Sequence, residues 1–237
     1  HHLYFLPMSD LYKMLVRPFF FKMEAETAHE IVCEILAYVE SFPFFKKTIE
    51  TLLRSPKDEK IVFGLRFPNA LGLAAGFDKN GLFPGVSKAL GFGHIEIGTV
   101  TPKPQPGNIK PRLFRVIEEN SIINRMGFNN HGAEAMGRRL EKYYPKQGRI
   151  SPLGINIGKA KSTPLEETLG DYLQCIDFLN KSADYFTINI SSPNTPGLRE
   201  LHKQEFLDPL LKGIDERLEK IAKMTFQEKI PYLLKIC

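Results

Sequence analysis

The sequence contains few cysteines and no tryptophan among its 237 residues, and these scarcities exclude several classes of protein. Its three cysteines, Cys33, Cys175 and Cys237, lie far apart and form no C-x-x-C pair. Neither a disulfide framework nor a zinc site is therefore expected, and the compartment is expected to be reducing. No stretch reaches the roughly 18 uncharged apolar residues that a membrane-spanning helix needs.

Sequence fingerprints of several other protein classes are also missing. Gly91-Phe-Gly93 lacks the third glycine of a dinucleotide-binding motif, and there is no P-loop. No G-x-S-x-G elbow surrounds the serines at 191 and 192, which disfavours a Ser-His-Asp hydrolase. The net charge of +5 is spread along the chain without a basic stripe or an aromatic RNA-binding signature, so no nucleic acid partner is expected. The charge is compatible with an anionic substrate, an acidic membrane surface or an ordinary solvated surface.

The first quarter of the chain has a helical pattern and is unusually apolar. Apolar residues recur there at the spacing of one helix face, at Ile31, Val32, Ile35, Leu36 and Val39. Pro43 ends this pattern, and an aromatic cluster flanked by cations, at 17–22, precedes it. Two interpretations stay open: a helical hairpin packed on the main domain, or an amphipathic surface that dips into a bilayer. We assign residues 8–55 to this helical extension; residues 1–7, which open with His1-His2, are compatible with a tag remnant.

After a polar linker at 55–60, short apolar runs alternate with helical patterns. Strands are expected at about 61–67, 70–75, 94–100, 153–157, 185–190 and 231–236. Helices are expected at about 81–90, 131–143, 165–180 and 203–224. This alternation predicts an α/β fold with a parallel sheet. The apolar run Leu153-Gly-Ile-Asn-Ile157 suits a strand that is buried on both faces.

Polar residues follow or end several of these strands. Asp78, Lys79 and Asn80 come after the second strand, and the third ends with Thr99. Asn residues stand inside the next two strands, at 156 and 189. Each position alone is more often a satisfied core amide or a turn residue. Several such residues at one rim of a barrel predict a site for a small, polar, planar ligand.

At the same positions the sequence resembles the class 2 dihydroorotate dehydrogenases. The resemblance runs from about residue 9 to the end and is carried by six motifs in the family's order. These are Leu73-Ala-Ala-Gly-Phe-Asp-Lys-Asn80, Ile95-Glu-Ile-Gly-Thr-Val-Thr-Pro102, Pro106-Gly-Asn108 with Lys110-Pro-Arg-Leu-Phe-Arg115, Ile123-Asn-Arg-Met-Gly-Phe-Asn-Asn130, Gly154-Ile-Asn-Ile-Gly-Lys159, and Ile188-Asn-Ile-Ser-Ser-Pro-Asn-Thr-Pro-Gly-Leu-Arg199.

The resemblance implies a (β/α)8 TIM barrel that holds FMN at its C-terminal rim. The implied reaction oxidises dihydroorotate to orotate, in de novo pyrimidine biosynthesis, and passes the electrons to ubiquinone or menaquinone. It implies that Ser192 is the catalytic base, with Phe128 and Thr195 flanking it along the exit route of the proton. The implied substrate-binding residues are Lys79, Asn124, Arg125, Met126, Gly127, Phe128, Asn189 and Asn194. The implied FMN-binding residues are Ala75, Gly76, Phe77, Asp78, Lys79, Thr99, Asn156, Asn189 and Lys235.

Two features point to the quinone-reducing class within this family. Class 1 relatives carry cysteine where Ser192 stands, and they lack the helical extension. The resemblance makes that extension a hood for a quinone tunnel, with His29 and Arg112 at the tunnel. It implies a monomeric peripheral membrane protein on the cytoplasmic face of a bacterial inner membrane, or on the mitochondrial inner membrane in a eukaryote. The alternatives are a class 1-like flavoenzyme that uses fumarate or a nicotinamide, and a non-catalytic membrane-binding fragment.

The sequence departs from the family in its length. A complete barrel needs about 250 residues, whereas residues 56–237 offer only five of the eight strands. We therefore expect 56–237 to be the N-terminal part of the barrel, and 1–237 alone to bind FMN weakly. Cys237 also departs from the family's pattern, without an explanation in the sequence.

Overall fold

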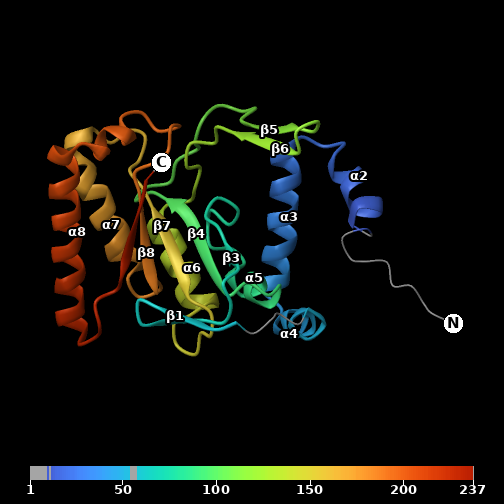
Figure 1. The fold of residues 1–237 in the computed structure, drawn as a ribbon, viewed down its shortest axis with the longest axis horizontal. Coiled ribbons are helices and arrows are strands. Elements are labelled where there is room, and N and C mark those ends of the chain that lie inside the picture. The colour runs from blue at the N-terminus through green and yellow to red at the C-terminus, as the bar shows by residue number, and fades with distance from the viewer. Residues whose placement is uncertain (1–9, 11, 54–57, 237) are drawn as a thin grey trace.

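The fold was analysed in a computed structural model of the chain, which describes residues 10, 12–53 and 58–236. The segment compatible with a tag, Cys237 and part of the linker lie outside the described residues. The described chain forms a five-stranded parallel sheet with helices against it and a group of N-terminal helices to one side (Figure 1).

The parallel sheet confirms the fold class expected from the sequence, an α/β fold built as part of a (β/α)8 barrel. Its strands are neighbours in chain order: β3 (Gly72–Leu73), β4 (His94–Val100), β7 (Leu153–Ile157), β8 (Tyr185–Asn189) and β9 (Tyr232–Lys235). Parallel neighbours need crossover connections, and helices stand in each of them: α5 (Pro84–Ala89), α6 (Ala133–Tyr143), α7 (Thr168–Leu179) and α8 (Gln204–Thr225).

Alternation along the central strands separates an apolar face from a polar one. Ile95 and Ile97 on β4 are fully buried in the main core, together with side chains of α6, α7 and α8. Glu96, between them, points to the opposite face, as successive strand residues do. Phe186 and Ile188 of β8 repeat the pattern around Thr187. The apolar face thus holds the helices on the sheet, and the polar face becomes the barrel interior.

Two strand predictions differ from the structure, and one further pair of strands was missed. The expected strand at 61–67 is a hairpin, β1 (Lys60–Val62) with β2 (Leu65–Phe67), because Phe63 and Gly64 both adopt positive φ and reverse the chain. The strand expected at 70–75 is only two residues long. The hairpin of β5 (Leu113–Val116) and β6 (Ser121–Asn124) was not expected at all.

The helices also begin later than their patterns suggested. The helix expected from 81 begins at Pro84, since proline suits the first turn, where its missing N–H costs nothing. The pattern at 165–180 divides into a 3-10 turn, η2 (Leu165–Glu167), and α7. A further 3-10 segment, η3 (Leu198–His202), precedes α8.

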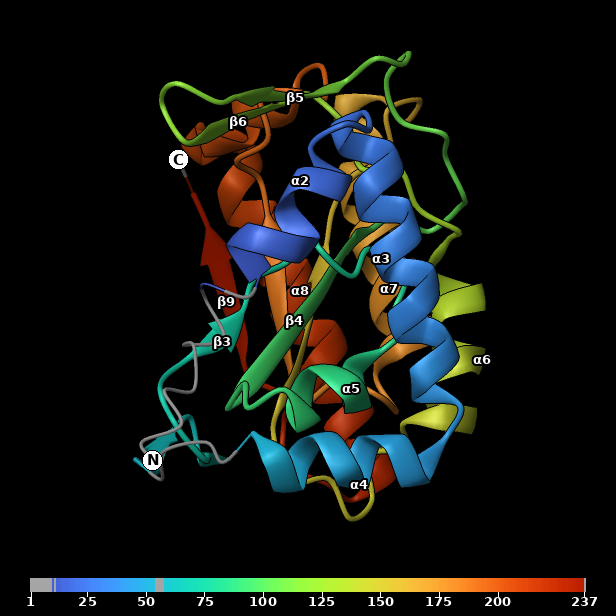
Figure 2. The same ribbon diagram turned by 90° about the vertical axis from the view of Figure 1, so that its right-hand side faces the viewer.

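The described part of the N-terminal extension is helical and lies along one side of the barrel (Figure 2). It contains a π-helical segment, η1 (Tyr12–Val16), and α2 (Arg17–Phe20), α3 (Ala25–Glu40) and α4 (Pro43–Leu52). None of the described helices has the length and apolar character needed to cross a bilayer.

Two buried carboxylates attach α3 to the rest of the protein. Glu40, at its C-terminal end, accepts a hydrogen bond of 2.7 Å from the Val86 N–H in the first turn of α5. Glu26, at its N-terminal end, accepts hydrogen bonds of 2.8–3.1 Å from the Arg112 guanidinium next to β5. The helix is therefore fixed to the barrel at one end and to the hairpin at the other.

Candidate active site

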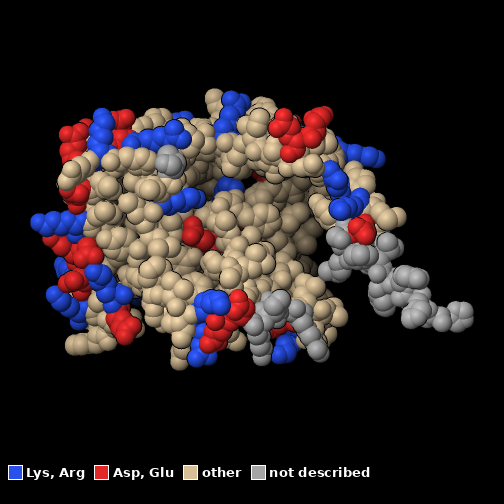
Figure 3. Space-filling model, viewed as in Figure 1, with Lys and Arg blue, Asp and Glu red and all other residues tan. Residues whose placement is uncertain are grey.

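A cavity of about 240 Å³ opens at the carboxyl ends of the strands, where a barrel places its ligands. Figure 3 shows a hollow in this face of the molecule, surrounded mainly by uncharged residues. The cavity is lined by Ala75, Gly76, Lys79, Thr99, Asn124, Met126, Gly127, Phe128, Asn189, Ser191, Ser192, Pro193, Asn194 and Lys235. Residues from five separate segments of the chain therefore meet at one point, as the sequence analysis expected.

The floor of the cavity comes from strand ends. Ala75 and Gly76 follow β3, Thr99 lies near the end of β4, and Asn189 and Lys235 end β8 and β9. Gly76 has a φ of +108°, and a Cβ added there would meet no atom within 4 Å. The backbone at this point is open to the cavity, which leaves room for a flat ring to approach it.

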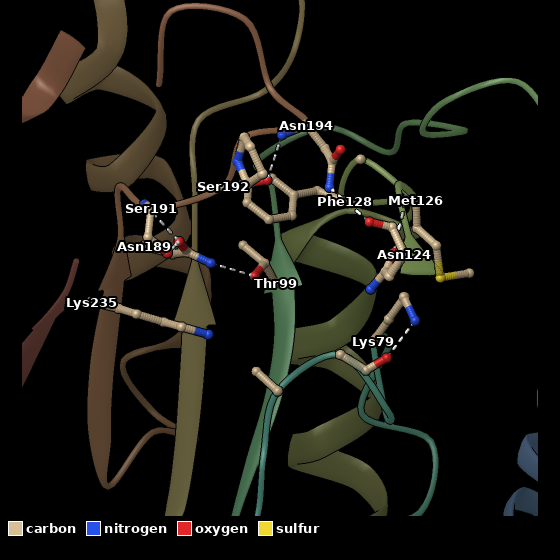
Figure 4. Close-up of a pocket in the computed structure, with 14 residues that line it drawn as sticks. Lys79, Thr99, Asn124, Met126, Phe128, Asn189, Ser191, Ser192, Asn194 and Lys235 are labelled. Carbon is tan, nitrogen blue, oxygen red and sulfur yellow. Dashed lines mark hydrogen bonds between the residues drawn. The ribbon is translucent and has the colours of Figure 1, made fainter. Parts of the chain in front are cut away.

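Two lysines enter the cavity from opposite sides (Figure 4). The Lys235 ammonium group has no hydrogen-bond or ion-pair partner within the described part of the chain. Lys79 donates to the Gly76 carbonyl, and burial lowers the pKa of its ammonium below the ordinary value. Two cations at one small cavity make it suited to an anionic ligand.

Asp78 shapes the loop that carries Lys79. Its carboxylate is almost fully buried and accepts hydrogen bonds from the N–H groups of Asn80, Leu82 and Phe83, at 3.3, 2.9 and 3.0 Å. Burial raises the pKa of Asp78 in spite of these donors. The side chain of Asp78 is thus used to hold the loop, and neither it nor Phe77 lines the cavity.

The serines stand on the loop after β8. The side-chain oxygen of Asn189 accepts two hydrogen bonds from Ser191: one from the hydroxyl, at 2.9 Å, and one from the backbone N–H, at 3.1 Å. Ser192 is only half-buried, and its hydroxyl oxygen accepts the N–H of Asn194 at 3.2 Å. Among the described residues, the hydroxyl has no other hydrogen-bond partner, so its proton and one lone pair are available to a ligand.

The residues around Ser192 enclose it. The Asn194 side chain donates to the Asn124 carbonyl at 3.4 Å, which links the serine loop to the hairpin. Phe128, with a positive φ of 56°, lines the same cavity (Figure 4). The Thr195 hydroxyl is buried and has no hydrogen-bond partner among the described residues. An unsatisfied buried hydroxyl is uncommon and indicates a group that is completed by a ligand or water.

Two further residues assigned by the resemblance lie outside the cavity lining. Asn156 is fully buried below it and bonds to Thr99 and Asn189. Arg125 is exposed; its guanidinium donates to the Pro111 carbonyl at 2.8 Å and lies 5.5 Å above the Phe114 ring. Arg125 therefore braces the hairpin rather than facing the cavity.

A second cavity of about 250 Å³ lies between α3 and the loop after β3. Lys79 and Met126 line both cavities, so the two adjoin. His29 faces the second cavity and contacts the Phe77 carbonyl at 2.9 Å. Burial, and then the charge of Lys79, lower the pKa of His29.

Arg112 stands behind this second cavity and does not line it. Besides Glu26 it binds the carbonyls of Pro106 and Asn108, at 2.5 and 2.8 Å. Arg112 therefore has a structural role at this cavity, because it holds Glu26, which lines the second cavity. The first cavity is also lined by Ser191 and Pro193, to which no role was assigned from the sequence. Their position on either side of Ser192 in the motif could have identified them as cavity residues.

Comparison with known proteins agrees with the site. A family model described as dihydroorotate dehydrogenase matches residues 59–237. The chain is 48% identical to a "dihydroorotate dehydrogenase (quinone)" of Teredinibacter turnerae, over 93% of this chain and 62% of the relative. It is 43% identical to the protein of the same description from Delftia acidovorans, over 97% of this chain and 65% of the relative.

Solved structures agree as well. A ligand-free DHODH from Eimeria tenella superposes with a TM-score of 0.76 at 37% identity, over 90% of this chain and 61% of that chain. The same enzyme in complex with ferulenol gives a TM-score of 0.72 at 34% identity, over 88% and 59% of the two chains. The chain thus spans about three fifths of the length of the proteins it matches. On the family match and these identities, the chain belongs to the dihydroorotate dehydrogenase family.

Proposed function

We propose that the protein oxidises dihydroorotate to orotate with FMN as cofactor and a quinone, ubiquinone or menaquinone, as electron acceptor, in de novo pyrimidine biosynthesis. One observation carries the proposal: Ser192, Lys79 and the amides of Asn124, Asn189 and Asn194 meet at one cavity. The descriptions of the curated relatives, which name both dihydroorotate and quinone, support it.

The residues present fit a flavin. The open backbone at Gly76 leaves space for a flat ring, and Thr99 and Asn189 offer polar groups along its edge. The Lys235 ammonium group, which has no partner among the described residues, would stabilise negative charge on a ring nitrogen. When bound, FMN would accept the hydride from C6 of dihydroorotate and pass electrons to the quinone. Phe77, Asp78 and Asn156 would support these contacts from behind.

The substrate's charge and ring match the other side of the cavity. Orotate carries a carboxylate, for which Lys79 supplies the cation. Its ring is edged with N–H and C=O groups, which the side chains of Asn124 and Asn194 can pair. Each buried polar group of the ligand left without a partner would cost about 1–3 kcal/mol. Met126 and Gly127 would close this side by van der Waals contact.

Ser192 would act as the base that removes the proton from C5. A serine hydroxyl is a poor base in water, so it needs a closed site and a relay that carries its own proton away. Phe128 excludes water beside it, and the unsatisfied hydroxyl of Thr195 offers the next step of a relay. The proton held at Ser192 Oγ would leave by this route.

The second cavity supports the assignment of a quinone. It adjoins the first at Lys79 and Met126, and it opens beside the N-terminal helices. His29 would face the quinone, and Arg112 would hold this wall in place through Glu26.

The surface of the extension supports attachment to a membrane. Large apolar side chains are exposed on it, among them Met14, Leu15, Phe19, Tyr38 and Phe44. Such a surface, with nearby cations, suits a helix group that lies in the interface of a bilayer. We place the protein at the cytoplasmic face of a bacterial inner membrane, or at the mitochondrial inner membrane in a eukaryote, as a peripheral monomer.

An absorbance spectrum of the purified full-length protein, before and after anaerobic addition of dihydroorotate, tests the function. The visible flavin band is expected to bleach and to return on addition of a quinone but not of fumarate. Return with fumarate would favour the class 1-like alternative, and a flavin that does not bleach would overturn the substrate. Lipid binding by a protein without flavin would favour the non-catalytic fragment.

A further inference from the structure

A hydrogen-bonded layer of polar side chains lies inside the barrel, directly below the floor of the active-site cavity. It is formed by Glu96 of β4, Asn156 of β7 and Thr187 of β8. These strands are adjacent, and Gly154, which pairs with Glu96, has no side chain to separate them. None of the three residues lines the cavity.

Glu96 is the acceptor at the centre of this layer. One carboxylate oxygen accepts the side-chain N–H of Asn156 at 2.8 Å, and the other accepts the Thr187 hydroxyl at 3.0 Å. No ion pair joins Glu96 to a cation of the described residues. Burial raises the pKa of the neighbouring Tyr185, and the charge of Glu96 and a hydrogen bond to its carboxylate raise it further. A glutamine offers one accepting oxygen and one donating NH2, so it could not accept from both donors. The specific property of the carboxylate is that both of its oxygens accept and neither donates.

Because Glu96 can only accept hydrogen bonds, it fixes the orientation of the Asn156 amide. Because Glu96 takes the side-chain N–H of Asn156, the amide oxygen of Asn156 must face the other way, toward the cavity floor. There it accepts the Thr99 hydroxyl at 2.5 Å and the side-chain N–H of Asn189 at 3.1 Å.

The orientation of Asn156 in turn constrains the amide of Asn189. The side-chain nitrogen of Asn189 donates to Asn156 and, at 3.0 Å, to the Thr99 hydroxyl. Its oxygen therefore faces the serine loop, where it accepts both hydrogen bonds of Ser191. The amides are thus fixed from both ends: Glu96 can only accept from Asn156, and the backbone N–H of Ser191 can only donate to Asn189.

We propose that Glu96 is a positioning residue, which fixes the amide orientation of Asn156. Together with the Ser191 N–H, it thereby sets the donors and acceptors that the cavity floor presents to the flavin. The inference rests on the proposed function for its ligand. Glu96 itself touches neither flavin nor substrate in this assignment; it acts through Asn156.

The hydrogen bond between Glu96 and Asn156 can be tested by exchanging the carboxylate and the amide between these two positions. N156D removes the donor and sets two carboxylates against each other, so FMN affinity of the full-length protein is expected to fall about 100-fold. E96Q alone allows both orientations of Asn156 and is expected to cost about 10-fold. The double variant E96Q/N156D restores a donor facing an acceptor, and it is expected to recover about 10-fold or more over N156D. Affinity would be measured by titrating FMN into the flavin-free proteins.

Thr187→Val is the matched control, since it removes the second donor to the same carboxylate and leaves Asn156 in place. It is expected to weaken FMN binding much less than E96Q. Equal losses in these two variants would overturn the proposal, as would an E96Q effect that is the same with and without N156D.

A second measurement does not depend on flavin. In the flavin-free protein, the side-chain amide NMR signals of Asn156 and Asn189 are expected to shift or double in E96Q and to stay unchanged in T187V. Signals that E96Q leaves unchanged would overturn the proposal. A wild type that fails to bind FMN while these amides respond to E96Q would overturn the proposed function and leave the positioning role standing.

Discussion

Ser192 and Ser191 are adjacent in the chain but differ in what their hydroxyl groups do. The Ser191 hydroxyl is committed to Asn189, whereas the Ser192 hydroxyl accepts one backbone N–H and keeps its proton free. Only Ser192 can therefore take part in proton transfer without breaking an existing contact. The two residues form a matched pair for separating catalysis from loop structure.

If Ser192 is the base proposed above, Ser192→Ala is expected to slow reduction of the bound flavin by dihydroorotate about 10²- to 10⁴-fold, because it removes that base and leaves the cavity intact. Stopped-flow absorbance measures this rate directly. Flavin affinity should be unchanged, and Ser191→Ala should slow reduction far less. Comparable losses in both variants would show that the loop, and not a base at 192, sets the rate.

Protonation of Lys79 is expected to make ligand binding at the site depend on pH. Burial lowers the pKa of its ammonium below 10.5, so the cation is lost at a lower pH than that of an exposed lysine. In the proposed function the protonated form attracts the carboxylate of orotate, so affinity for orotate is expected to be full at low pH and to fall as pH rises through the lowered pKa.

Orotate titrations followed by the flavin spectrum, from about pH 7 to 10, would measure this dependence. Lys79→Gln should bind orotate weakly at every pH and lose the slope. A slope that survives in this variant would assign the titration to another group.

Among the elements, the helix α3 and the hairpin β5–β6 are joined by the buried ion pair of Glu26 and Arg112. Burial raises the pKa of Glu26, but the hydrogen bonds and charges of Arg112 and Lys110 outweigh it, so the pKa lies below its ordinary value. The carboxylate therefore stabilises the fold at pH values above its unfolded pKa of about 4.5, and this contribution is lost as pH falls through the lowered folded value.

Glu26→Gln is expected to destabilise the protein by about 3–5 kcal/mol, because it leaves the buried Arg112 guanidinium without its counter-charge. Urea unfolding at neutral pH measures the loss, which should shrink in acid, where the wild-type carboxylate is also protonated. Glu30→Gln is the control on the same helix: Glu30 pairs with Lys110 in solvent, and its loss should cost at most about 1 kcal/mol. Equal losses would place the stabilisation outside the buried pair.

The sequence predicted the elements whose burial is regular and missed those that depend on distant contacts. β4, β7 and β8 follow from their apolar runs, because both of their faces are covered. The hairpin strand β6 is exposed at all four positions, and its partner β5 is mostly half-buried, so no alternation of buried and exposed residues marked them. The cavity residues were found through the family's motifs, whereas the Glu96 layer depends on strand register, which no single motif contains.

Over the whole molecule, the N-terminal helices and α8 lie on opposite sides (Figure 1), and the second cavity is lined by residues of α3. Phe44 on α4 is 76% exposed, and Phe226 at the end of α8 is 96% exposed. Two exposed phenylalanines at opposite sides of one protein allow the membrane surface to be located by substitution.

Phe44→Asp is expected to weaken binding to anionic lipid vesicles about 10-fold or more, since burial of a phenylalanine in an apolar phase contributes about 1.5–3 kcal/mol. Vesicle co-sedimentation measures this, and Phe226→Asp should have no effect. Reduction of the flavin by dihydroorotate should be the same in both variants, because neither residue lies at the cavity. Reoxidation by a long-chain quinone in vesicles should slow only in Phe44→Asp, because that quinone must be reached from the bilayer. If Phe226→Asp instead releases the protein from vesicles, the membrane would face α8, and the N-terminal helices would serve only to cover the barrel.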